Sequence, residues 1–330
     1  MAARHRVKLS RLLIDWYRKG HRDLPWRRTG EPYRIWVSEI MLQQTRAQAA
    51  IPYYERFLER FPTVTALAAA TEEEVLALWS GLGYYSRARN LRRAAQHVSQ
   101  AGGFPREYEA IRALPGVGDY TAAAIASIAF GRPHAVLDGN VMRVVARIEA
   151  DSGDIASART RQRFRAIAQE WLDPKQPGAF NQALMELGAT VCLPRNPLCL
   201  LCPLASHCAA HQQGAVTQYP VKLRKTEPVQ IAAVLLLVRR GTRILLRKTE
   251  AGARRMAGFW ELPPPEQLPD ARIGKTVGTF RHTITHHHYT FTVKMATARA
   301  PGAGFQWFDA SQWQNIPLST TARKALRLAR

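Results

Sequence analysis

The four cysteines of the chain all fall within one short segment, and this constrains its fold more than any other feature. They are spaced C-x6-C-x2-C-x5-C, at Cys192, Cys199, Cys202 and Cys208. Disulfides do not persist in a reducing compartment, so thiols concentrated in this way usually bind metal. Four thiolates suit a tetrahedral zinc ion or a 4Fe–4S cluster. The single CxxC pair favours the cluster modestly over zinc, and structural disulfides are the least favoured alternative.

The chain lacks the sequence signals of a membrane or exported protein. Its longest apolar run, Ile231–Val238, has the length of a strand and not the roughly 18 residues of a membrane span. The segment Met1–Lys8 is basic and has no signal-peptide core. We therefore expect a cytoplasmic protein, associated with the nucleoid if bacterial, with no membrane partner.

The charge of the chain favours a polyanionic partner. Its 47 Lys and Arg residues outnumber 25 Asp and Glu residues, which gives a net charge of +22. The excess is shared evenly by the parts before and after residue 228, so both parts could lie on one nucleic acid, bound through counterion release. A basic proteome or a membrane-surface protein is the alternative.

The spacing of apolar residues changes along the chain. From Leu9 to about His211 it is the three- and four-residue spacing of helices, whereas later segments alternate like strands. The pattern predicts an all-α domain over 1–211, a linker over 212–228 and an α+β domain over 229–330. Helices are expected at Ala66–Trp79, Ala88–Gln100, Tyr120–Phe130 and from Thr320, and strands at Val229–Val238, Arg243–Arg247, Phe280–Ala298 and Phe305–Phe308.

Three motifs in the helical part could carry chemistry. The turn Leu114–Gly118 precedes a helix whose free N–H groups could bind a phosphate, or it is a plain helix connection. Asp138 is either an N-cap or a carboxylate held near a reacting sugar. Glu39 is either an acid with a raised pKa in an apolar helix start or a first-turn residue that favours the helix dipole. The residues by themselves leave each choice open.

Together these motifs resemble the helix-hairpin-helix glycosylase superfamily with its iron–sulfur cluster. Within it, Leu24-Pro25-Trp26, the Glu39 segment, Gly81–Arg87 and Phe180–Gly188 resemble the adenine DNA glycosylase (MutY) family. The resemblance runs densely from about Arg22 to Cys208. It implies a monofunctional enzyme of base excision repair that removes adenine mispaired with 8-oxoguanine or guanine from double-stranded DNA and leaves an abasic site.

The resemblance also implies roles for single residues. Glu39 would protonate adenine, Asp138 would stabilise the cationic sugar, and Tyr120 and Asn140 would support them, which requires environments that push the two carboxyl pKa values apart. Tyr120 stands where lyase relatives carry a nucleophilic lysine. The flipped base would contact Arg22, Trp26, Arg27 and Gln182. The DNA around it would contact Gln44, Thr45, Leu82, Tyr84, Gly116, Val117 and Gly118, with Tyr84 either a wedge or a core residue.

The last hundred residues resemble the Nudix-like domain with which this family recognises 8-oxoguanine. Gly258–Pro265 runs into prolines and lacks the glutamate-rich helix of a catalytic Nudix domain, so we expect no pyrophosphatase activity. The reading loop would be Ile284-Thr285-His286, in which Ile284 replaces an aromatic residue. A zinc site formed by the nearby histidines is the alternative for this segment.

The resemblance implies one 4Fe–4S cluster per chain, held by the four cysteines, and a monomer. Two rival functions remain. A bifunctional glycosylase and lyase for oxidised pyrimidines is disfavoured by Tyr120 and by the second domain, and a non-catalytic DNA-damage binder is disfavoured by the presence of both Glu39 and Asp138.

Overall fold

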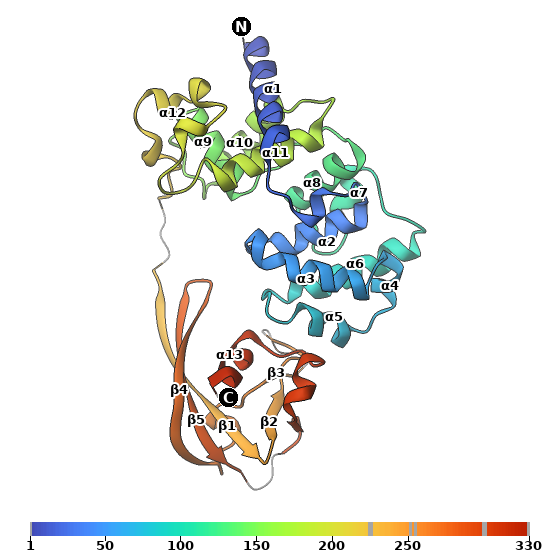
Figure 1. Ribbon diagram of the computed structural model, residues 1–330, viewed down its shortest axis with the longest axis vertical. Helices are drawn as coiled ribbons and strands as arrows, with labels where there is room; N and C mark the ends of the chain where they lie inside the picture. The colour runs from blue at the N-terminus through green and yellow to red at the C-terminus, as the bar shows by residue number, and fades with distance from the viewer. Residues whose placement is uncertain (1, 224–226, 251–252, 254–255, 299–301, 329–330) are drawn as a thin grey trace. The chain divides into compact units, whose positions relative to one another are not determined.

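The computed structural model describes residues 2–223, 227–250, 253, 256–298 and 302–328, and it divides the chain into two compact units (Figure 1). The first unit comprises Met1–Ile51 and His97–Lys225, and the second comprises Pro52–Gln96 and Thr226–Arg330. Helices from the first third of the chain therefore pack with its C-terminal part. The sequence boundaries at 211 and 228 stay a prediction.

The first unit is helical and is built around α11 (Pro177–Thr190), which packs against α1, α8 and α9. Pro177 suits the first position of α11, where an N–H would have no partner inside the helix. Phe164, Phe180 and Leu184 are fully buried in its core. The other helices are α1 (Ala2–Gly20), α2 (Pro32–Leu42), α7 (Tyr108–Arg112), α8 (Asp119–Phe130), α9 (Gly139–Ile148), α10 (Ala158–Trp171) and α12 (Ala209–Gln212).

The predicted helix Ala66–Trp79 is in fact two helices. They are α4 (Val64–Ala69) and α5 (Glu72–Trp79), and the break between them is a capping box. Thr71 accepts from the backbone of Glu74, whose side chain accepts from Thr71 in return, so the start of a new helix is more favourable here than continuation. The neighbouring helices are α3 (Ala47–Arg60) and α6 (Ser86–Gln100).

The C-terminal part of the second unit is a mixed sheet that packs with α13, a helix of nine residues, which confirms the α+β prediction. The strand order is β3-β2-β1-β5-β4, with β6 beside β2, and β1 and β5 run parallel (Figure 1). The bounds are β1 (Val229–Arg240), β2 (Arg243–Lys248), β3 (Trp260–Glu261), β4 (Arg272–Ile284), β5 (His287–Thr297), β6 (Phe305–Phe308) and α13 (Thr320–Leu328).

The predicted single strand Phe280–Ala298 was wrong, because the chain reverses inside it. Ile284 pairs with His287, and Thr285 takes the positive φ of 56° that the tight turn requires. Thr285 and His286 therefore lie at the tip of a β4–β5 hairpin. Sequence alternation continues through such a turn, so it did not reveal the reversal.

The first half of the predicted linker lies against the first unit. Arg147 Nε donates to the carbonyls of Val216 and Tyr219, each at 3.1 Å, and Ile155 N donates to Val221 O at 3.0 Å. Residues 224–226 of the linker lie outside the described part of the chain. No helix among the described residues is long and apolar enough to cross a membrane.

Candidate active site

One cavity of about 1190 Å³ in the first unit brings together most of the residues singled out in the helical part. It is open to one side, as a site for a flipped base must be. Its walls come from α2, α8, α9, α11 and the segments before α2 and α3. The predicted residues that line it are Arg22, Trp26, Arg27, Glu39, Gln44, Thr45, Gly118, Tyr120, Asp138, Asn140 and Gln182.

Glu39 is a buried carboxyl group in this cavity. It lies in the last turn of α2 and is only 5% exposed, so the first-turn dipole interpretation is wrong. Burial raises the pKa of Glu39 to about 7, opposed by the hydrogen bond that Tyr120 Oη donates to Oε2 at 2.7 Å and reinforced by the negative charge of Asp138. A large fraction of Glu39 is therefore protonated at neutral pH, as a general acid requires.

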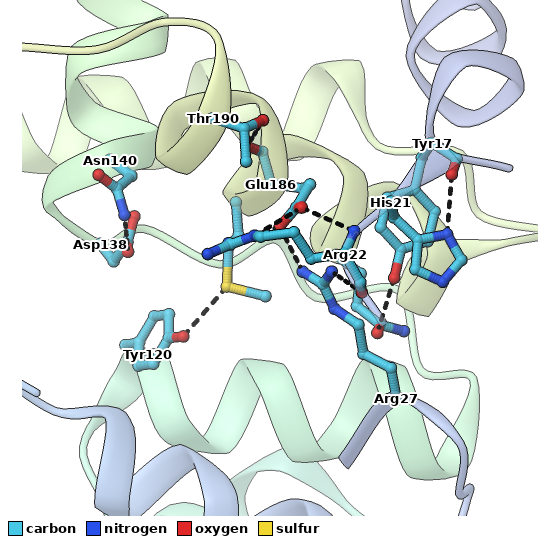
Figure 2. A network of polar contacts seen from close by, with 11 residues as sticks. Tyr17, His21, Arg22, Arg27, Tyr120, Asp138, Asn140, Glu186 and Thr190 are labelled. Atoms are coloured by element: carbon cyan, nitrogen blue, oxygen red, sulfur yellow. Dashed lines mark hydrogen bonds and ion pairs between the residues drawn. The ribbon is translucent and has the colours of Figure 1, made fainter. Parts of the chain in front are cut away.

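Asp138 is both an N-cap and a residue of the cavity, so its two interpretations do not exclude each other. Its Oδ1 accepts from the backbone N–H of Val141 at 2.7 Å, and Oδ2 accepts from Asn140 Nδ2 at 3.4 Å (Figure 2). Burial raises the pKa of Asp138, and these N–H groups oppose the rise. Burial thus raises both carboxyl pKa values, whereas the sequence led us to expect them to be pushed apart.

Tyr120 stands at the start of α8, next to Glu39. Burial holds the pKa of Tyr120 well above 10, and the neighbouring charges of Glu39 and Asp138 raise it further. Its hydroxyl therefore keeps its proton and acts as a donor to Glu39. The same oxygen lies 3.1 Å from Met185 Sδ, which fixes the ring from the α11 side (Figure 2).

Glu186 is a site residue that sequence reasoning missed. Its carboxylate accepts from the backbone N and Nε of Arg22 at 3.1 and 2.8 Å, and from Arg22 Nη2 and Arg27 Nη2, both at 2.7 Å (Figure 2). Burial would raise the pKa of Glu186, but the hydrogen bonds from both arginines outweigh it and lower the pKa to about 2. Its position four residues after Gln182, on the same helix face, was the available signal.

Gln182 is oriented by a residue of α1. Tyr17 Oη donates to Gln182 Oε1 at 3.1 Å, and the Tyr17 ring stacks on His21 with centroids 4.3 Å apart. The guanidinium of Arg27 lies over the Tyr17 ring, with its central carbon 5.4 Å from the ring centroid. These contacts join the arginines and Gln182 in one polar network on one wall of the cavity.

The turn Leu114–Gly118 connects α7 to α8. Gly116 has φ 77°, a conformation that favours glycine, and Val117 N donates back to Leu114 O at 3.1 Å. Gly118 is the N-cap of α8 and lines the cavity, whereas Gly116 and Val117 lie outside its lining. The turn is therefore a helix connection and also leaves the start of α8 exposed, so the two interpretations of this turn do not exclude each other.

The remaining predicted DNA contacts belong to the second unit. Leu82 is buried at 9% exposure, whereas Tyr84 is 45% exposed and has φ 48°, so Tyr84 is not a core tyrosine. At the hairpin tip Thr285 is exposed, with its hydroxyl 3.4 Å from His286 Nδ1. No set of three or more His, Cys, Asp or Glu side chains in the described ranges is arranged to hold a single metal ion.

The four cysteines line one small apolar cavity beside α9 and α11, and none of them forms a disulfide. Arg147 Nη1 donates to Cys192 Sγ at 3.2 Å, and Cys208 Sγ donates to Arg147 O at 3.3 Å. Burial raises the pKa of Cys202 to about 12 in this apolar setting. The four thiols thus line the same cavity, with the Arg147 guanidinium beside Cys192, but their side chains are not arranged around a single metal ion. Four cysteines in one segment are the donor set of an iron–sulfur cluster.

Comparison with known proteins decides the family. The profile of the HhH-GPD superfamily of base excision DNA repair proteins matches residues 37–173. The chain is 35% identical to the adenine DNA glycosylase of Homo sapiens, over 96% of this chain and 73% of that protein. It is 33% identical to the adenine DNA glycosylase of Schizosaccharomyces pombe, over 96% of this chain and 88% of that one.

The chain belongs to the adenine DNA glycosylase family. Among solved structures, a thermostable thymine-DNA glycosylase superposes with a TM-score of 0.57 at 27% identity, covering 64% of this chain and all of that one. The predictions of a helical glycosylase part, an α+β C-terminal part and an adenine DNA glycosylase of base excision repair are confirmed. This glycosylase acts on DNA, as the family does.

Proposed function

We propose that this glycosylase hydrolyses the N-glycosidic bond of adenine paired with 8-oxoguanine or guanine in double-stranded DNA, acting as a monomer and leaving an abasic site. The observation that carries the proposal is the hydrogen bond that Tyr120 Oη donates to Glu39 Oε2 at 2.7 Å, because it places a phenol beside the acid. A lysine amine at this position could attack the sugar, form a Schiff base and cut the strand, whereas a phenol has no nitrogen with which to form one.

The two carboxyl groups divide the reaction between them. Glu39, with a pKa of about 7, donates a proton to the adenine ring and makes it a better leaving group. Asp138, held by the N–H groups of Val141 and Asn140, is ionised and stabilises the oxocarbenium-like sugar. Burial raises the pKa of Glu39, and the nearby negative charge of Asp138 raises it further, which favours the protonated form of Glu39.

Other residues of the cavity lining hold the flipped base. Arg22, Trp26, Arg27 and Gln182 line the cavity, and Glu186 fixes the two guanidinium groups by three hydrogen bonds. Because the carboxylate of Glu186 already orders the two arginine side chains, they lose less conformational entropy when they bind a base. Glu186 is therefore a positioning residue for base binding in this proposal.

Residues of both units would engage the rest of the duplex. Tyr84, exposed on its loop, fills the gap left by the extruded adenine, with Leu82 beside it and Gln44 and Thr45 on the opposite strand. The turn residues Gly116, Val117 and Gly118 bind a backbone phosphate. The Nudix-like domain over 229–330 reads 8-oxoguanine with Thr285 and His286 at the hairpin tip and hydrolyses no pyrophosphate.

The four cysteines would hold one 4Fe–4S cluster, which supplies a rigid, charged anchor for the segment around it. Arg147 contacts Cys192 Sγ and the carbonyls of Leu193 and Val216, so it ties this segment to α9. Arg143, one turn earlier, donates to Cys192 O at 2.7 Å and to Asn140 Oδ1 at 2.8 Å. The cysteine segment thereby supports the residue beside Asp138.

The test is single-turnover excision from four duplexes that carry A·8-oxoguanine, A·G, A·T or an oxidised pyrimidine, each with and without alkali. Strand breaks at A·8-oxoguanine that require alkali are expected. Nicking at the pyrimidine lesion without alkali, with adenine untouched, would overturn the proposal. As a matched variant, Tyr120→Lys should become trappable by borohydride on the A·8-oxoguanine duplex, and no trapping would mean that position 120 does not face the sugar.

A further inference from the structure

The loop Ser80–Tyr85, which carries Tyr84 between α5 and α6, has an unusual backbone. Gly81, Gly83 and Tyr84 all have positive φ, at 110°, 72° and 48°. Glycine reaches this region freely, and a Cβ on Gly81 would collide with the hydroxyl of Tyr53. Tyr84 has a side chain and pays a conformational penalty there, so neighbouring groups must hold it in place.

Arg87 is the residue that holds this loop. Its Nη2 donates to the carbonyls of Gly83 at 3.0 Å and Leu82 at 3.3 Å, and its Nε donates to Tyr84 O at 3.4 Å. A single planar guanidinium thus donates hydrogen bonds to three successive carbonyls, and a lysine ammonium could not reproduce this geometry. Trp79 Nε1 adds a fourth donor, to Gly83 O at 3.2 Å.

The guanidinium also contacts the Tyr84 ring. Its central carbon lies 5.5 Å from the centroid of Tyr84 and 5.5 Å from that of Trp79. Arg87 is only 9% exposed, and burial lowers the pKa of Arg87 to about 10, so it is still charged at neutral pH. A buried cation against an aromatic ring restricts the directions that the Tyr84 side chain can take.

Both ends of the loop are fixed from the C-terminal part of the same unit. Ser80 Oγ donates to Leu318 O and accepts from Arg323 Nε at 2.8 Å. The Tyr85 ring lies on Phe259 with centroids 3.9 Å apart. Tyr84 is the exposed aromatic residue of an otherwise anchored loop.

We propose that Arg87 is a positioning residue that presets Tyr84 as the wedge for base extrusion before DNA binds. The inference rests on the wedge role proposed above for Tyr84. A preset wedge fills the vacated stack without first losing conformational entropy, so extrusion of the base becomes more favourable. Arg87 acts through Tyr84 and touches neither the base nor the sugar.

The experiment measures extrusion separately from chemistry. Fluorescence of 2-aminopurine placed beside adenine opposite 8-oxoguanine reports extrusion, in an Asp138→Asn background that holds the substrate intact. Arg87→Met is expected to lower the extrusion equilibrium about tenfold. Arg93→Met removes the same charge from the exposed face of α6, where Arg93 contacts Asn90, and should change extrusion less than twofold. Equal extrusion by both variants overturns the proposal.

A double-mutant cycle separates positioning from a general loss of structure. In a Tyr84→Ala background, Arg87→Met should change extrusion less than twofold, because the side chain it positions is gone. If the two effects multiply, Arg87 does not act through Tyr84 and the proposal fails. Arg87→Lys keeps the charge but lacks the planar guanidinium, so it should lower extrusion as much as Arg87→Met does. If thermal unfolding shows that the methionine variant is not folded, Arg87→Lys replaces it in the cycle.

The proposed function and this inference fail in different ways. If the wild-type protein does not excise adenine opposite 8-oxoguanine, the function is wrong whatever Arg87 does. If excision is fast but extrusion is insensitive to Arg87→Met, only the positioning role is wrong.

Discussion

Replacing Glu39 by glutamine should stabilise the protein while abolishing excision. Glu39 is buried, and its pKa is about 7 in the folded protein, against 4.5 for an ordinary glutamate. A folded-state pKa above the unfolded value means that the folded protein holds the proton more tightly. Stability from this group is therefore complete below pH 4.5 and is lost as pH rises through 7.

The magnitude follows from the size of the shift. Each pKa unit corresponds to 1.36 kcal/mol, so ionised Glu39 costs the folded state on the order of 3 kcal/mol above pH 7. Glutamine does not titrate, and its amide oxygen can still accept from Tyr120. The stability of Glu39→Gln relative to wild type should grow by about 2 kcal/mol between pH 5.5 and 8.5.

Urea unfolding of both proteins at a series of pH values measures this difference, since other titrating groups cancel in the comparison. Glu59→Gln is the matched control, because it removes the same charge from an exposed side chain of α3. A stability difference for Glu39→Gln that does not change with pH, or that falls toward pH 8.5, would refute the raised pKa. A stable variant that still excises adenine would refute the role of Glu39 as acid.

Three further changes test the rest of the site. Asp138→Asn should abolish excision while gel-shift binding of the A·8-oxoguanine duplex persists, and near-normal excision would contradict the assigned mechanism. Tyr120→Phe removes the hydrogen bond that lowers the pKa of Glu39, so the alkaline limb of the single-turnover rate should move up by about one pH unit; an unmoved limb would show that this bond has no effect on the acid. Gly188→Ala would place its Cβ 2.7 Å from Asn140 Cβ and 3.2 Å from that residue's carbonyl. It should lower stability by about 1–3 kcal/mol in thermal unfolding and slow excision, and an unchanged melting temperature would mean that α9 yields without cost.

Local patterns predicted those elements whose signals are themselves local. The helical spacing and the alternation after Val229 each depend on residues close in sequence, and the helical and α+β parts inferred from them are confirmed. The cysteine segment is a local signal too, and the iron–sulfur cluster inferred from it stays a prediction. The same local patterns failed where a short signal overrode them. The capping box at Thr71 starts a new helix inside one predicted helix. The positive φ of Thr285 allows a tight turn inside one predicted strand, which is therefore a hairpin.

The sequence by itself determined which chemical groups are available: two acids, a phenol in place of an amine, four thiols and a strongly basic surface. Only the tertiary structure decided their states. The pKa of Glu39 depends on burial between α2 and α8 and on the charge of Asp138 from α9, segments roughly a hundred residues apart in the chain. The hydrogen bonds of Glu186 with Arg22 and Arg27 likewise join residues that are 164 and 159 positions apart in the chain. Desolvation and Coulomb interactions depend on distances in space, and a linear pattern does not contain those distances.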